Sequence, residues 1–162
     1  AVIGGAMLDD SVRRALEQRL RPKDGTTDMN NKLFRVGGPL GNTGPKIDLG
    51  YQLYMLDKPH RNAMHGLSEI RNLFAHNLSM SFADQGTKMK EASAKLLLHE
   101  GITHYPDPLL NMEDAMPELE PTTTPRDRFL VNLKLGLLWL AADYFKHESW
   151  SNVPTSYKVA GT

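Results

Sequence analysis

The sequence predicts an all-α fold, a single helical bundle of five or six helices. Apolar residues recur at intervals of three and four in every long segment, which places them on one side of a helix. No alternating apolar and polar run is longer than a few positions, so no strand is expected. With 162 residues, the chain is long enough for one continuous core but too short for two ordinary domains. We expect the domain to cover residues 1–150 and a polar C-terminal tail to cover 151–162.

The first expected helix runs from Ile3 to Leu20 and is ended by Pro22. Gly4 and Gly5 inside it are poor helix formers, and small residues at such positions often mark a close crossing of two helices. A short helical turn is expected at 32–36. The remaining expected helices cover 46–55, 59–76, 87–98 and 125–148.

The helix at 59–76 has a clear start, because Asp57 can cap it and Pro59 suits its first turn. Phe82 is the expected anchor of the loop that follows this helix. The helix at 125–148 is apolar on more than one face, which is typical of a central helix. We therefore expect these two helices to form the core pair.

A glycine-rich loop at 37–45 contains four glycines and two prolines, which raises the question of phosphate binding. The Walker pattern needs Gly-Lys followed by Ser or Thr, and Gly44-Pro45-Lys46-Ile47 does not supply it. The dinucleotide fingerprint needs a preceding strand, and no β-branched run precedes the loop. We interpret it as a rigid turn that lets two helices approach closely.

The overall composition excludes several classes of protein. Nineteen Lys and Arg balance nineteen Asp and Glu, so broad electrostatic binding to nucleic acid is not expected. The absence of cysteine excludes disulfides and thiolate metal sites. Charged residues interrupt the longest apolar stretch, and the acidic first ten residues do not resemble a signal peptide. We expect a cytoplasmic protein with no membrane contact and no cofactor.

A polar row along the 59–76 helix is the strongest signal of a site or a specified interface. It lies opposite the apolar stripe formed by Leu67, Ile70, Phe74 and Leu78. Its members, spaced three or four apart, are Arg61, His65, Glu69, Asn72 and His76. We assign Arg61, His65 and Glu69 to binding or an interface.

Two pairs of potential metal ligands do not have the spacing of a metal site. His65 and Glu69 are four residues apart, but no third ligand has matching spacing, so an exposed ion pair is expected instead. His99 and His104 are five residues apart, whereas the zinc-protease helix needs a spacing of four.

Three blocks of this sequence resemble the mannitol operon repressor family in order and spacing. They are Gly38-Pro39-Leu40-Gly41, Lys46-Ile47-Asp48-Leu49-Gly50-Tyr51 and Ile70-Arg71-Asn72-Leu73-Phe74-Ala75-His76. Met7-Leu8-Asp9-Asp10 and Arg126-Asp127-Arg128-Phe129 extend the likeness over most of the chain, from about Ile3 to Lys146. The resemblance implies an all-helical bundle, a homodimer and a transcriptional regulator. Because no helix-turn-helix pattern and no strongly basic helix is present, a protein partner would have to supply the DNA contacts.

A second, narrower resemblance concerns Arg71-Asn72-x-x-x-His76, which is similar to the motif of HEPN ribonucleases. Members of that helical family cut RNA without a metal, with two copies of the motif facing each other across a dimer. The resemblance implies that His76 is a general base on a ribose 2′-hydroxyl, which suits an imidazole pKa near 6.5. Arg71 would stabilise the phosphorane-like transition state, and Asn72 would orient His76.

A purely structural role for these three residues remains open. His76 lies near the helix end, where a donor can satisfy the last carbonyls. Arg71 could pair with an acid of the first helix, such as Asp9 or Asp10. The regulatory function is ranked first, and the ribonuclease is the alternative.

Overall fold

The computed structural model describes residues 1–20, 32–84, 86–98 and 124–151, the last seven as helical backbone only. Within these ranges every regular element is helical and no strand occurs, which confirms the all-α prediction. No helix in the described ranges combines the length and the apolarity needed to cross a membrane. The predicted tail beyond Ser151 lies outside the described residues. The helices are α1 (Val2–Arg19), α3 (Thr43–Gln52), α4 (Lys58–His76), α5 (Thr87–Ser93) and α7 (Pro125–Ser151), with a single helical turn at 32–34 before α3.

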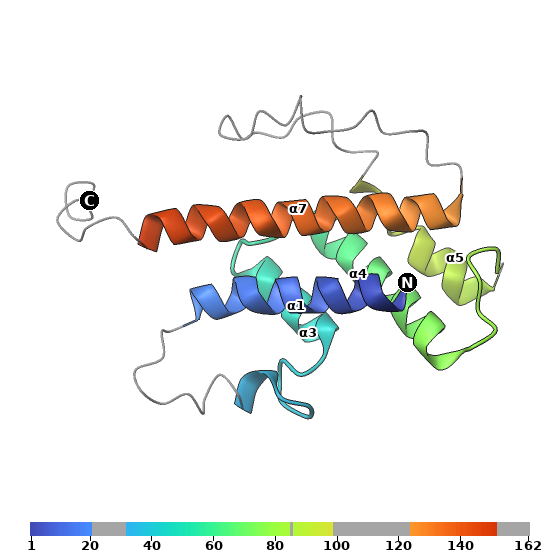
Figure 1. Ribbon diagram of the computed structural model, residues 1–162, viewed down its shortest axis with the longest axis horizontal. Coiled ribbons are helices and arrows are strands. Elements are labelled where there is room, and N and C mark those ends of the chain that lie inside the picture. The colour runs from blue at the N-terminus through green and yellow to red at the C-terminus, as the bar shows by residue number, and fades with distance from the viewer. Residues whose placement is uncertain (21–31, 85, 99–123, 152–162) are drawn as a thin grey trace.

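Helices α1 and α7 lie side by side and run in the same direction (Figure 1). Near their starts, Gly4 packs against Phe129 and Leu133, and near the end of α1 Arg19 pairs with Asp143. Helix α4 runs the opposite way across both, so that its C-terminal end meets the N-terminal end of α1.

The core is shared by three helices and is not confined to the expected pair. Helix α4 does pack on α7, where Met64 contacts Gly136. However, the fully buried Leu8, Val12 and Leu16 make α1 an equal contributor. The expected pair was incomplete because α1 also turns a continuous apolar side inward.

The start of α4 is fixed by the predicted cap. Asp57 Oδ1 accepts a hydrogen bond from the backbone N–H of His60 at 2.8 Å and lies 2.7 Å from His60 Nδ1. The buried imidazole of His60 stacks on Trp139 of α7, with ring centroids 3.9 Å apart. Trp139 Nε1 in turn donates to the carbonyl of Met55 at 2.8 Å. The α3–α4 connection is therefore held against α7.

The ends of three helices differ from the expected bounds by more than one residue. Helix α3 begins at Thr43, because Pro45 is tolerated within a first helical turn. It ends at Gln52, because Tyr54 takes a positive φ of 57° and closes the helix with a left-handed cap. Helix α5 is shorter than expected and α7 extends to Ser151.

The end of α4 is anchored from one side only. Phe82 of the following loop contacts Phe74 and Phe129, with ring centroids 4.7 and 5.5 Å away, as expected for an anchor. Leu78, in contrast, is fully exposed. Its assignment to the apolar stripe was wrong because α4 ends at His76 and the backbone becomes extended at Asn77.

Candidate functional site

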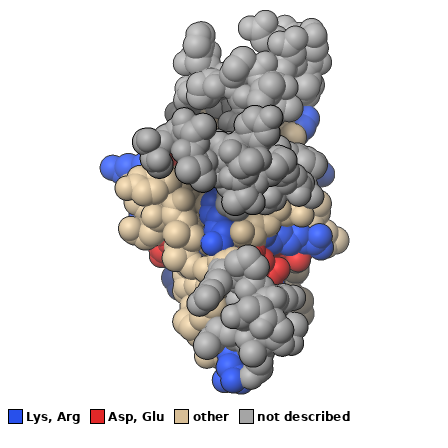
Figure 2. Space-filling view, turned by 90° about the vertical axis from the view of Figure 1, so that its left-hand side faces the viewer, with Lys and Arg blue, Asp and Glu red and all other residues tan. Residues whose placement is uncertain are grey.

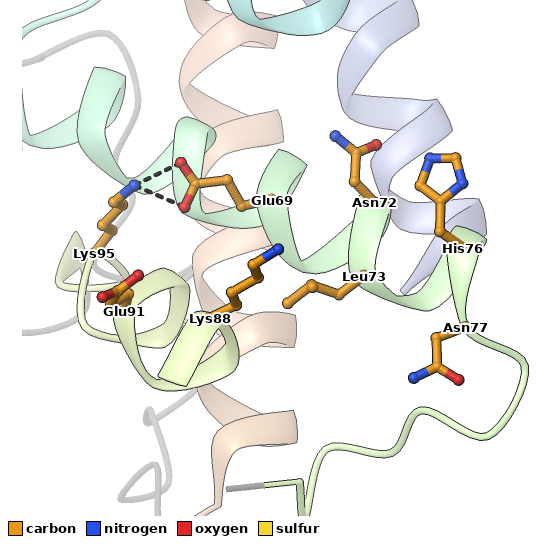
Figure 3. Close-up of a pocket in the computed structure, with 8 residues that line it drawn as sticks. All are labelled: Glu69, Asn72, Leu73, His76, Asn77, Lys88, Glu91 and Lys95. Carbon is orange, nitrogen blue, oxygen red and sulfur yellow. Dashed lines mark hydrogen bonds and ion pairs between the residues drawn. The ribbon is translucent and has the colours of Figure 1, made fainter. Parts of the chain in front are cut away.

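The polar end of α4 borders an open cavity of about 490 Å³ between α4 and α5 (Figure 3). Asn72 and His76 lie one turn apart on α4, and the side chain of Lys88 reaches from α5 toward Leu73. His76 is exposed, and no hydrogen bond or ion pair involves it among the described residues. The lining residues are Glu69, Asn72, Leu73, His76, Asn77, Lys88, Glu91 and Lys95.

Arg61 and His65, at the other end of the polar row, both bind Asp48 of α3. Arg61 Nε donates to Asp48 Oδ1 at 2.8 Å, and His65 Nε2 lies 3.0 Å from the same oxygen. The hydrogen bond from His65, followed by that from Arg61, holds the pKa of Asp48 below its usual value against the opposing effect of burial. These two residues therefore fasten α3 to α4.

Glu69 is paired with Lys95, which follows α5. Lys95 Nζ lies 2.5 Å from Glu69 Oε1 and 2.6 Å from Oε2. Dashed lines mark both contacts in Figure 3. The expected pair between His65 and Glu69 is wrong. His65 is bound to Asp48 of α3 instead, and Glu69 is bound to Lys95. Within the described ranges no group of three His, Cys, Asp or Glu could hold a metal ion.

Arg71 contacts a neighbouring amide and the first helix, and forms no ion pair among the described residues. Its Nη1 donates to Asn72 Oδ1 at 2.9 Å, and its aliphatic stem packs on Gly5 of α1. It makes no pair with the first helix, since Asp9 binds Lys46 and Asp10 binds Arg14. The structural alternative in which Arg71 pairs with Asp9 or Asp10 therefore does not occur among the described contacts.

The structure separates the Arg-Asn-His group into two neighbouring environments. Arg71 lines a second cavity, of about 350 Å³, between α1, α3 and α4. His76 lines the cavity toward α5, and Asn72 borders both. No hydrogen bond joins Arg71 to His76 among the described contacts. The three residues of the motif therefore line two adjoining cavities, with Arg71 in one, His76 in the other and Asn72 between them.

The polar cluster around Asp9 was not predicted from the sequence. Lys46 Nζ donates to both Asp9 carboxylate oxygens at 2.7 Å, and Thr43 Oγ1 donates to Oδ1 at 2.7 Å. Only 3% of the Lys46 side chain is exposed. A helical wheel could have indicated part of this, because Lys46 and Asp48 project to nearly opposite sides of α3 and so require two polar partners.

Comparison with known proteins adds no family assignment. No protein-family model, curated protein or solved structure matches the chain. The resemblances to the mannitol operon repressor family and to the HEPN ribonucleases rest on the motifs quoted above.

Proposed function

We propose that the chain is a cytoplasmic regulatory interaction protein of the mannitol operon repressor type that has no DNA-reading element of its own. The observation that supports this proposal is that six of the fifteen described Lys and Arg side chains are paired with carboxylates of described residues. Six ion pairs occupy Lys and Arg side chains: Arg13–Glu17, Arg14–Asp10, Arg19–Asp143, Lys46–Asp9, Arg61–Asp48 and Lys95–Glu69.

Pairing of this kind opposes DNA binding for a simple electrostatic reason. Affinity for a duplex comes largely from Lys and Arg side chains that neutralise phosphates and release counterions. A cation already bound to a carboxylate would have to give up that partner first. On the face in Figure 2, the visible blue side chains of the described residues are separated by tan and red ones.

The end of the bundle where α4 finishes also carries apolar side chains suited to a protein partner. Met7 of α1 is about half exposed and Ile3 is 79% exposed, while Leu78 follows α4 directly. Helices α1 and α4 meet at Gly5 and Arg71, so Ile3 and Met7 lie at the end of α1 that is beside the end of α4. Apolar residues beside polar groups are characteristic of interaction surfaces. A partner seated there would supply the DNA contacts.

The proposal is tested by comparing variants in partner binding and DNA binding. Ile3→Glu with Met7→Glu should abolish capture of a specific partner from native cytoplasm. Val36→Glu, at a 98% exposed apolar residue outside this group, should leave capture intact. The partner complex should bind a regulatory duplex and the isolated chain should not. Tight binding of a specific duplex by the isolated chain at physiological salt would contradict the proposal.

A metal-independent ribonuclease is the second candidate, and the exposure of His76 favours it. A general base must be reachable by the substrate, and His76 lies at an open cavity rather than in the core. His76 would remove the proton of a ribose 2′-hydroxyl, whose oxygen then forms a bond to phosphorus. The P–O5′ bond breaks, and His76 of a second copy protonates the leaving oxygen. Arg71 would stabilise the phosphorane charge.

RNA cleavage in the presence of a chelator separates the two candidates. His76→Ala should lower the cleavage rate by roughly 10²–10⁴-fold, the usual contribution of a general base. His65→Ala is the matched control, because His65 is bound to Asp48 and lies outside both cavities. Equal cleavage by wild type and His76→Ala would assign the activity to a contaminant and leave Arg71 and His76 with structural roles.

A further inference from the structure

The second cavity, between α1, α3 and α4, has a volume of about 350 Å³, enough for a small metabolite. Three helices and the loop before α3 line it, so its walls come from separate parts of the sequence. The lining residues are Ala6, Asp9, Gly41, Asn42, Thr43, Gly44, Ser68, Arg71 and Asn72. Nearly all of them present a polar side chain or a glycine backbone.

Arg71 supplies a fixed positive charge in this cavity. Its stem is held against α1 at Gly5, and one of its N–H groups is bound to Asn72. The other guanidinium N–H groups have no partner among the described residues. A guanidinium presents its donors in a planar fork that matches a phosphate or a carboxylate, and half-burial strengthens such bonds.

The acid on the opposite side does not cancel this charge. Asp9 is already neutralised by the buried ammonium of Lys46 and also accepts a hydrogen bond from Thr43. Ser68 contributes a hydroxyl, and the two Asn residues of the lining contribute amides. These groups can exchange hydrogen bonds with the hydroxyls of a ligand. The cavity therefore combines one cation with several neutral donors and acceptors.

We propose that this cavity binds a small hydroxylated oxyanion, with the phosphate or carboxylate group on Arg71 and the hydroxyl groups on Ser68, Asn42 and Asn72. Arg71 selects the anion through charge-assisted bonds. A ligand without hydroxyls would leave the polar lining unpaired, which costs affinity. The inference goes beyond the proposed function, because the cavity binds its ligand whether or not the chain regulates transcription or cleaves RNA.

Calorimetric titration with five probes tests the ligand class. Glycerol 3-phosphate combines hydroxyl groups with a phosphate, and glycerate combines them with a carboxylate. Whichever of the two binds more tightly identifies the preferred anion. Propyl phosphate and inorganic phosphate lack the carbon-bound hydroxyls and should bind more weakly, and glycerol should not bind. The proposal is overturned if neither hydroxylated anion binds at millimolar concentration. Equal binding of propyl phosphate and glycerol 3-phosphate would overturn the role given to the hydroxyls.

Variants locate the binding in this cavity. Arg71→Gln should weaken binding of the better probe at least tenfold, the range expected for a lost charge-assisted bond. Lys90→Gln is the matched control, since it removes the same charge from an exposed residue of α5 that lines neither cavity, and it should leave binding unchanged. Arg71→Lys is the second variant, to be used if Arg71→Gln does not fold. It keeps the positive charge but not the planar fork of donors, so it should retain part of the affinity. Wild-type affinity in a folded Arg71→Gln protein would overturn the site.

Discussion

Gly5 of α1 lies directly against the aliphatic stem of Arg71 on α4. A Cβ atom added at Gly5 would be 2.2 Å from Arg71 Cγ and 2.6 Å from Arg71 Cβ, far closer than atoms in contact allow. The missing side chain therefore does two things. It lets α1 and α4 cross closely, and it keeps the guanidinium of Arg71 at the cavity between α1, α3 and α4.

Gly5→Ala should destabilise the fold and displace Arg71. Overpacking at a close contact typically costs about 1–3 kcal/mol, more than the helix gains from alanine. Gly136→Ala is the matched control, because its nearest neighbour, Met64 Cε, would be 3.5 Å away, an ordinary contact. That control should gain about 0.5–1 kcal/mol from helix propensity. Urea denaturation of both variants measures the two changes, and equal effects would contradict the close crossing.

Tyr54→Gly should stabilise the protein. Tyr54 has a φ of 57° and is 96% exposed. The left-handed conformation is strained at this residue, and contacts of its side chain do not compensate for the strain. Glycine removes this strain but also increases the conformational entropy of the unfolded chain, which offsets part of the stabilisation. The net increase in the free energy of unfolding should be about 0.5–1 kcal/mol. Leu53→Gly, at a neighbouring residue with φ of −88°, should instead destabilise. Thermal denaturation in which Tyr54→Gly melts below the wild type would refute the prediction.

Asp9→Ala should cost more stability than removing the whole ion pair. The variant leaves the Lys46 ammonium, 3% exposed, without its carboxylate, a loss of about 3 kcal/mol. The double variant Asp9→Leu with Lys46→Met replaces both charges with apolar groups and should recover much of this loss. Chemical denaturation of the single and double variants completes the comparison. If the double variant is less stable than Asp9→Ala, the ion pair contributes more to the fold than the neutralisation of a buried charge.

The contribution of Asp48 should depend on pH. Its folded pKa is lowered from 3.8, so its ionised form stabilises the folded state. That contribution is complete above pH 3.8 and is lost as the pH falls through the folded pKa. Asp48→Asn should therefore destabilise at pH 7, by less than about 1 kcal/mol because the carboxylate is half exposed, and the difference should shrink toward pH 3.

Urea titrations between pH 7 and pH 3 measure this difference. Glu91→Gln is a suitable comparison, because Glu91 has no hydrogen bond or ion pair among the described residues. Its small effect should not follow the same pH profile. A constant gap between wild type and Asp48→Asn over the whole range would show that Arg61 and His65 do not favour the ionised carboxylate.

The candidate site was only partly predictable. Helical spacing placed Asn72 and His76 one turn apart, and both do border the cavity beside α5. The same spacing placed Arg61, His65 and Glu69 in one row, yet their partners lie on α3 and after α5. Periodicity gives the direction of a side chain from its own helix axis. It contains no information about which neighbouring helix faces that side chain.

The sequence by itself determined the all-helical class, the start of α4 at Asp57 and Pro59, and the close crossing at Gly5. These depend on local rules of hydrogen bonding, proline geometry and side-chain size. Only the tertiary structure decided that Asp9 binds Lys46 and that Arg71 and His76 face different cavities. Such pairings join residues distant in sequence, and the packing of α1, α3 and α4 fixes which charged groups come within bonding distance.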